Sequence, residues 1–121
     1  MFSIRIETGF KAAHQLTLKD GSKELLHNHV WLVHTDVAAE QLNDIGLVMD
    51  FHLLKAMVDA SAEKLENISL NEIDYFKKNN PSAENVAKYI FQKLEPKLPQ
   101  RVKLYSVRVF EQSGCSAKFA K

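Results

Sequence analysis

The stretch that decides the fold is LLHNHVWLV, residues 25–33. Its Val, Trp and Leu residues favour a strand, and the run lacks the spacing of a helix, so we expect an extended segment that begins near His27. Side chains of a strand alternate between its two faces, which places His27 and His29 on the same face. Two imidazoles in this arrangement can chelate a metal ion.

His14, in the upstream run FKAAH at residues 10–14, could supply a third imidazole. Three imidazoles suit Zn²⁺ and leave the fourth tetrahedral position open for water or substrate. The alternative is that these are surface histidines, because a His-x-His pair also occurs by chance. His34 has the opposite strand parity to His27, and His52 lies at an expected helix start, so we interpret both as surface or interface residues.

Composition indicates one soluble globular domain over residues 1–121, since 45% of the residues are hydrophobic. Sixteen Lys and Arg against fifteen Asp and Glu, spread along the chain, predict neither a nucleic-acid partner nor an acidic tail. The N-terminus resembles neither a signal peptide nor a membrane span. Cys115 is the only cysteine and cannot form an internal disulfide, so we expect a reducing, cytoplasmic setting.

Periodicity predicts the order ββααββ. Alternation from residue 2 gives a first strand, in which Gly9 marks a bend or bulge, and a second strand runs from His27 to about residue 40. Residues 66–80 are expected to be irregular. The last two strands cover residues 102–110 and 117–120.

Two amphipathic helices fill the middle of the chain. The first follows Asp50 as N-cap and carries the stripe Leu54, Met57, Val58, Ala62 and Leu65, with Ser61 as its one polar member. The second begins near Ser82, where either Asn80 with Pro81 or Ser82 could cap it, and its apolar side is Val86, Tyr89, Ile90 and Leu94. Pro96 and Pro99 end it.

This order indicates an α+β domain with a four-stranded, mostly antiparallel sheet and both helices on one face. The uncovered face favours oligomerisation.

Six ordered motifs resemble the 6-pyruvoyl-tetrahydropterin synthase and 6-carboxytetrahydropterin synthase family, over nearly the whole chain. They are FKAAH (10–14), LHNH (26–29), DFHLLK (50–55), LENISLN (65–71), NPSAEN (80–85) and VFE (109–111). Asn28 replaces the glycine of the family's Leu-His-Gly-His zinc motif.

The resemblance implies a tunnelling fold in which subunits join their sheets into a barrel, commonly a homohexamer built as a dimer of trimers. It implies Zn²⁺ held by His14, His27 and His29. It also implies a small-molecule pterin at a subunit interface, with Glu111 accepting two hydrogen bonds from its amino-pyrimidine edge. Judged by its position alone, Glu111 is an exposed charge at a strand end.

The proton-transfer residues depart from the family. The usual cysteine, four residues before the His-x-His, is Lys23 here, and the histidine of Leu-Asp-His is Asn67. Asparagine cannot relay a proton near neutral pH. Lys23 could be the base only in surroundings that favour its neutral amine. Glu24 lies one residue off register, and a related branch of the family uses glutamate instead of cysteine. Both residues could also be solvated loop charges.

Cys115 is expected to be inert. The sequence thus favours a zinc-dependent lyase acting on 7,8-dihydroneopterin triphosphate or a related pterin, with altered proton-transfer residues. The alternatives are a catalytically inactive zinc- and pterin-binding homologue and a different small-molecule activity on the same scaffold.

Overall fold

Two long antiparallel strands form the centre of the sheet. In this computed structural model, which describes residues 1–121, β1 (Phe2–His14) pairs with β2 (His27–Ala39) along its whole length. The register runs without a shift from Phe2 opposite Ala39 to His14 opposite His27. The expected bulge at Gly9 is therefore wrong. A Cβ at Gly9 would come 3.0 Å from the carbonyl oxygen of Trp31. Glycine at this position therefore lets the backbones of β1 and β2 approach closely.

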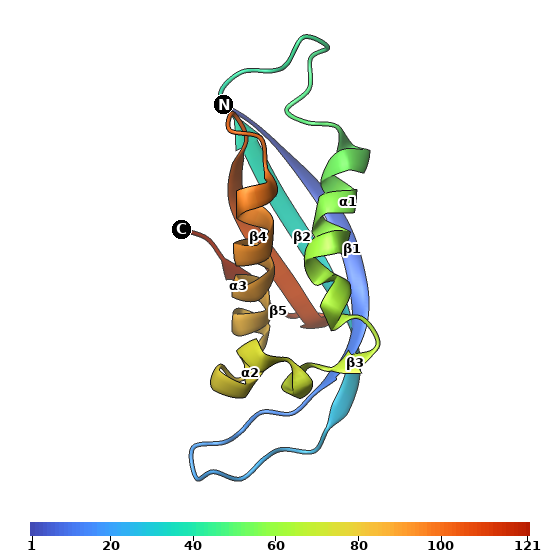
Figure 1. Cartoon of the computed structure of the whole chain (residues 1–121), viewed down its shortest axis with the longest axis vertical. Coiled ribbons are helices and arrows are strands. Elements are labelled where there is room, and N and C mark those ends of the chain that lie inside the picture. The colour runs from blue at the N-terminus through green and yellow to red at the C-terminus, as the bar shows by residue number, and fades with distance from the viewer.

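The sheet has five strands in the order β3-β1-β2-β4-β5, rather than the four expected (Figure 1). β4 (Lys103–Gln112) pairs antiparallel with β2, and β5 (Cys115–Phe119) pairs antiparallel with β4. The additional strand, β3 (Ile68–Ser69), pairs parallel with Ala12 and Ala13 of β1. Two residues are too few to show an alternating pattern, which explains why the sequence did not predict it.

The segment from residue 66 to 80 is also more ordered than expected. Besides β3 it contains a 3₁₀ turn at Leu70–Glu72 and the short helix α2 (Asp74–Lys78). Further 3₁₀ turns follow the two long helices, at Glu63–Leu65 and Glu95–Lys97. Each of these elements is one turn or little more, so none leaves a helical stripe in the sequence.

The two long helices, α1 (Phe51–Ala62) and α3 (Ala83–Leu94), lie side by side on one face of the sheet, as expected (Figure 1). α1 lies over β1, and α3 lies over β4 and β5. The apolar stripe of α1 is buried at Leu54, Val58, Ala62 and Leu65, and that of α3 at Val86, Tyr89, Ile90 and Leu94. The α+β class and the helix placement are confirmed. No helix has the length and hydropathy to cross a membrane.

The predicted caps are confirmed. The carboxylate of Asp50 accepts a hydrogen bond from the backbone N–H of His52 at 2.7 Å, which starts α1. Ser82, and not Asn80, caps α3, because its hydroxyl oxygen accepts from the N–H of Asn85 at 3.2 Å. The polar Ser61 is tolerated in the core because its hydroxyl donates to the carbonyl oxygen of Met57 at 2.8 Å.

We predict that Asp50→Ala lowers the free energy of unfolding by about 1 kcal/mol, because the first turn of α1 loses its cap. Urea unfolding followed by circular dichroism measures the change. The matched control is Asp44→Ala, which removes the same side chain from the exposed loop before α1 and should leave stability unchanged. Equal effects of the two substitutions would contradict this role for Asp50.

Candidate metal centre and adjoining cavity

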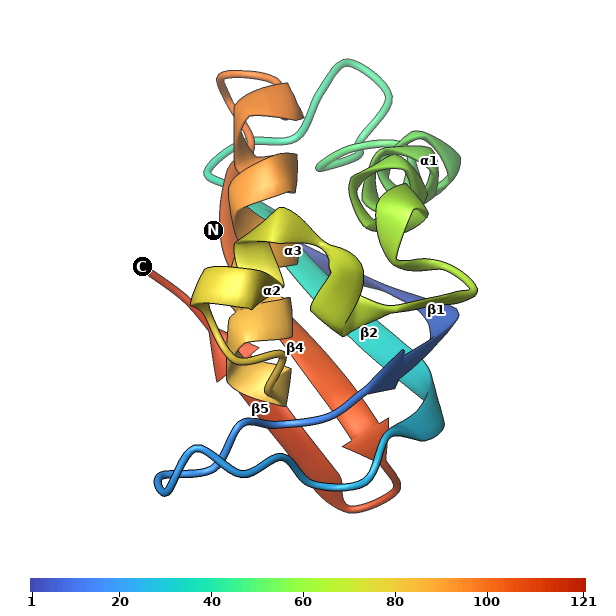
Figure 2. The ribbon, with the colours of Figure 1, turned by 60° about the horizontal axis from the view of Figure 1, so that its bottom comes forward.

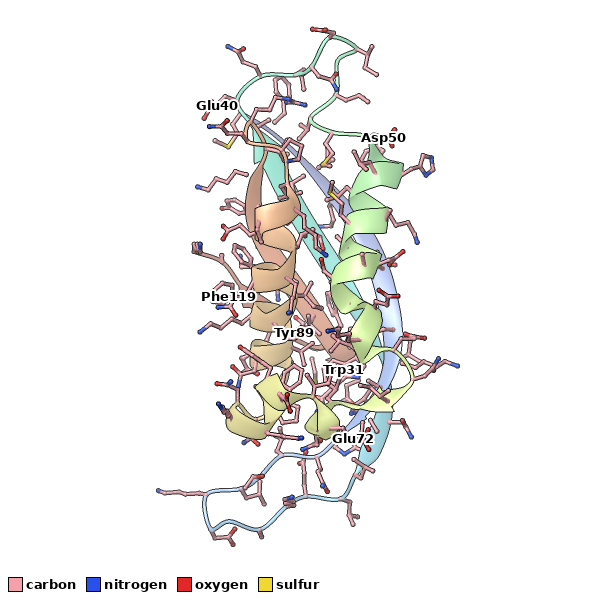
Figure 3. All side chains as sticks on the ribbon, in the orientation of Figure 1. Trp31, Glu40, Asp50, Glu72, Tyr89 and Phe119 are labelled. Carbon is pink, nitrogen blue, oxygen red and sulfur yellow. The ribbon has the colours of Figure 1, made fainter.

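The pairing of β1 with β2 brings three histidines to one corner of the sheet. His14 lies opposite His27, and His29 lies opposite Ala12, so the three side chains share the face that carries the helices. The fully buried Trp31 lies beside them in the lower half of Figure 3, with its ring centroid 4.8 Å from that of His14 and 5.7 Å from that of His29. The Trp31 indole N–H donates to the carbonyl oxygen of Ala12 at 3.1 Å, and this hydrogen bond fixes the position of the indole ring beside the histidines.

The imidazoles meet at their Nε2 atoms. Those of His14 and His27 are 2.9 Å apart, and Glu111 Oε1 lies 2.6 Å from His14 Nε2 and 3.1 Å from His29 Nε2. One ligand atom from each of these four residues lies within 4.8 Å of every other. Imidazole nitrogens and carboxylate oxygens are the ligands that zinc takes in proteins, so His14, His27, His29 and Glu111 form a candidate metal centre.

Glu111 reaches the histidines from β4. The pairing of β4 with β5 shifts register between Phe110 and Gln112, so Glu111 lies at a β-bulge with no residue opposite it in β5. Bulges commonly re-aim a side chain beside a functional site. We expected Glu111 to be an anchor for substrate and did not foresee its contact with the imidazoles. The strand parity of Val107, Val109 and Glu111 was the one available signal, because it places Glu111 on the helix-covered face.

Backbone carbonyls fix the tautomers of two of the histidines. Nδ1 of His14, a residue only 1% exposed, lies 2.7 Å from the carbonyl oxygen of Pro81. Nδ1 of His27 lies 2.8 Å from the carbonyl oxygen of Leu25. A carbonyl can only accept, so each Nδ1 carries a hydrogen and donates it. In the neutral rings the Nε2 lone pairs of His14 and His27 then point at one another and at Glu111.

This donor set fits a divalent cation. Two lone pairs 2.9 Å apart and a nearby carboxylate repel one another unless positive charge lies among them. The buried Nε2 of His29 has no hydrogen-bond partner, although it lies close to Glu111. Burial lowers the pKa of His29, and the neighbouring His14 and His27 add to this, while Glu111 opposes it. The imidazole is therefore kept in the neutral form that binds metals.

A hollow of about 490 Å³ borders His29 on the open face of the sheet, opposite the face on which the imidazoles meet. Its polar lining comes from Lys11, Asn28, Asn67 and Ser69, and its apolar lining from Ala13, Val30 and Ile68. Asn67 adopts the left-handed conformation, with φ of 61°, at the turn into β3. The residue that stands in place of the family's histidine thus lines this hollow and is not one of the four residues of the centre.

The other candidate residues lie outside the four-residue centre. Lys23 is exposed, and its backbone pairs with that of Thr17. Glu24 is half-buried, and its Oε1 accepts from the N–H of Leu16 at 3.0 Å. Cys115 is exposed at the start of β5, so it is not a packing residue.

The two remaining histidines are also separate from the centre. His34 faces the open side of the sheet, where its Nε2 lies 2.7 Å from Glu7 Oε1, and His52 is exposed in α1.

Comparison with known proteins identifies the family. The family model for 6-pyruvoyl tetrahydropterin synthase matches residues 3–121. The chain belongs to the 6-pyruvoyl tetrahydropterin synthase family. It is 35% identical to the 6-carboxy-5,6,7,8-tetrahydropterin synthase of Synechocystis over 98% of this chain and 93% of that protein. It is 34% identical to the dihydroneopterin monophosphate aldolase of Pyrococcus furiosus, over 84% of this chain and 82% of that protein.

Solved structures of family members share the fold. The 6-pyruvoyl tetrahydropterin synthase of Caenorhabditis elegans superposes with a TM-score of 0.87 at 22% identity, covering 99% of this chain and 95% of that one. The Plasmodium falciparum synthase gives a TM-score of 0.77 at 20% identity, covering 99% and 97%. The tunnelling fold of the 6-pyruvoyl tetrahydropterin synthase family is therefore present in this chain.

We predict that the purified protein retains one zinc ion per chain after dialysis and that His27→Ala loses it. Loss of a hydrogen-bond partner of a metal ligand typically weakens metal binding by roughly 10–100-fold. Removing one of the three imidazoles themselves should weaken zinc binding by more than this. Plasma mass spectrometry with chelator competition measures both quantities. The control is His34→Ala, on the open face of the sheet. Zinc retained with unchanged affinity in His27→Ala would contradict the centre.

Proposed function

We propose that the protein is a zinc-dependent enzyme that acts on 7,8-dihydroneopterin triphosphate or a closely related pterin, as a 6-pyruvoyl- or 6-carboxytetrahydropterin synthase-like lyase. The observation that carries this proposal is the convergence of three imidazoles and Glu111 at one point. His14, His27 and His29 would hold the metal, with the Nδ1 hydrogen bonds of His14 and His27 fixing the direction of their lone pairs.

Bound zinc would act as a Lewis acid toward oxygen atoms of the substrate side chain and make the adjacent protons easier to remove. Glu111 would orient the pterin by accepting two parallel hydrogen bonds from a ring N–H and the exocyclic amine. Glu111 contacts the imidazole nitrogens through Oε1 only, and in this proposal both of its oxygens turn to the bound pterin. The fourth metal position would then be open to an oxygen atom of the substrate.

The size and lining of the neighbouring hollow support a small polar substrate. A volume of about 490 Å³ lies in the range of small-molecule sites, roughly 300–1,000 Å³. The amides of Asn28 and Asn67 and the hydroxyl of Ser69 offer both donors and acceptors there, and Lys11 adds a positive charge suited to an anionic group. Lys11 and Asn28 lie on the face opposite the imidazoles, so this hollow would hold a part of the ligand other than the metal-bound side chain. The amide of Asn67 has no proton to exchange near neutral pH.

We propose Glu24 as the base, with Lys23 as the second choice. The backbone N–H that Glu24 binds belongs to Leu16, two residues beyond His14, so its carboxylate is tied to the chain that leaves the metal centre. A carboxylate can use its second oxygen as a base while the first accepts a hydrogen bond. Lys23 is exposed, and its ammonium makes no hydrogen bond or ion pair within the chain.

A second candidate reaction is aldol cleavage of a phosphorylated dihydroneopterin. The relative from Pyrococcus furiosus, named as an aldolase for the monophosphate, favours it. In such a cleavage a base takes the proton of a side-chain hydroxyl, whose oxygen becomes the carbonyl of a two-carbon aldehyde phosphate. The electron pair of the broken carbon–carbon bond stays on the carbon attached to the pterin, which takes up a proton to give a 6-hydroxymethyl pterin. The two reactions differ in their products, which makes them separable by mass.

We predict zinc-dependent conversion of 7,8-dihydroneopterin triphosphate or monophosphate, followed by chromatography and mass spectrometry, with His27→Ala as the inactive control. A 6-pyruvoyl or 6-carboxy product identifies the synthase reaction, and an aldehyde phosphate identifies the aldolase. Glu24→Gln should abolish turnover while zinc content is unchanged, and Lys23→Met should not. If neither substrate reacts with the zinc-loaded protein, although pterin binds, the protein is an inactive zinc- and pterin-binding homologue.

Glu111→Ala tests the pterin anchor. We predict that it weakens binding of the pterin by about 1–3 kcal/mol, because partner groups are left unpaired. Calorimetry on the zinc-loaded protein measures this change. Zinc content should stay at the wild-type level, since three imidazoles remain. Loss of zinc together with pterin would make Glu111 a metal ligand instead, and unchanged pterin affinity would overturn the anchor.

We further propose a cytoplasmic homo-oligomer, a hexamer built as a dimer of trimers. The sheet face opposite the helices carries the exposed Val30 and Leu32 and the half-buried Phe110, bordered by the Glu7–His34 and Arg5–Asp36 pairs. Adjacent apolar side chains on an exposed sheet face favour association, and sheets joined into a barrel would cover them.

A further inference from the structure

The chain that leaves the metal centre is held in an unusual way. After His14 ends β1, residues Gln15 to Thr17 have no neighbouring strand except an isolated bridge at Thr17. Yet every backbone N–H and carbonyl of these three residues is hydrogen bonded. The partners on one edge are two asparagine side chains, and the partner on the other edge is Glu24.

Each asparagine acts like a strand neighbour. The amide oxygen of Asn71 accepts from the N–H of Gln15 at 3.0 Å while its nitrogen donates to the carbonyl of Gln15 at 2.9 Å. The amide of Asn80 makes the same pair with Thr17, at 2.9 and 2.8 Å. A primary amide can mimic a peptide group because it offers one acceptor and a donor side by side. On the opposite edge, the N–H of Leu16 donates to the carboxylate of Glu24, and the carbonyl of Leu16 accepts from the backbone N–H of Glu24.

Asn80 is coupled to the metal centre by its neighbour in sequence. The carbonyl of Pro81 accepts the Nδ1 hydrogen of His14, so residues 80 and 81 hold both the ring of His14 and the backbone three residues later. The carbonyl of Asn80 is itself fixed by the side chain of Asn85 at 2.8 Å and the N–H of Ser82 at 2.8 Å. Figure 2 shows the segment after β1 passing below the chain that joins α2 to α3.

We propose that Asn80 and Asn71 are positioning residues of the metal centre, which fix the imidazole of His14 by clamping the backbone that follows it. This inference rests on the proposed zinc site. The two clamps come from separate segments, Asn71 from the 3₁₀ turn before α2 and Asn80 from the connection between α2 and α3. Together they set the position of His14 before metal binds, so that less conformational freedom is lost when the ion is bound.

The test compares Asn80→Asp and Asn71→Asp with Asn79→Asp as the matched control. Each change removes an amide N–H₂ donor and sets a carboxylate against a backbone carbonyl. Asn79 donates to the carbonyl of Tyr75 in α2, at 2.9 Å, and takes no part in the clamp. Zinc affinity is measured by chelator competition, and the ligand geometry is measured by the visible absorption of the Co²⁺-substituted protein.

We expect Asn80→Asp and Asn71→Asp to weaken zinc binding by about 10-fold or more, as loss of an outer partner does, and to alter the Co²⁺ bands. Asn79→Asp should match the wild type in both. A purely structural role would lower the melting temperature of all three variants without changing the Co²⁺ spectrum. Wild-type zinc affinity and spectrum in the two clamp variants would overturn the inference.

Hydrogen exchange on the unmodified protein covers the case in which the clamp variants do not fold. Zinc loading should slow exchange of the Gln15 and Thr17 amide hydrogens, because the clamp and the metal stabilise the same position of His14. Exchange rates that do not respond to zinc would overturn the inference. A wild-type protein that takes up no zinc would instead refute the proposed function, so the two failures are distinguishable.

Discussion

The register between β1 and β2 is the constraint on which the site depends. His14 lies opposite His27, and His29 is two residues further along the same strand, so all three imidazoles emerge on one face of the sheet. A slip of one residue would send the side chains of β2 to the other face. The register is held along 13 paired positions and by Trp31, which is fully buried beside the histidines and hydrogen bonded to Ala12.

Electrostatics then favours a cation at the meeting point of these side chains. The carbonyls of Pro81 and Leu25 oblige His14 and His27 to keep their hydrogens on Nδ1, so their Nε2 lone pairs meet the carboxylate of Glu111. Positive charge at that point relieves the repulsion among the three groups. The same geometry suits a metal with an open position, because the three imidazoles come from rigid strands while Glu111 comes from a bulge.

Much of this arrangement can be predicted from the sequence, because it follows from local periodicity. The shared face of His27 and His29 follows from the two-residue repeat of a strand, and the helix caps at Asp50 and Ser82 follow from local hydrogen bonding. The six motifs correctly indicated the family. Other features depend on tertiary contacts. β3 is two residues long, the position of Glu111 depends on a shift in strand pairing, and the clamps on Gln15 and Thr17 join residues more than 50 positions apart.

X-ray absorption at the zinc edge of the zinc-loaded protein tests the central claim most directly, because it reports the number and type of ligand atoms around the metal. The account predicts three imidazole nitrogens at about 2.0–2.1 Å and one oxygen from water or substrate. It also predicts that one imidazole contribution disappears in His14→Ala loaded with excess zinc. A spectrum with fewer than three imidazoles, or one that is identical in His14→Ala, would contradict a metal centre built on the β1–β2 pairing.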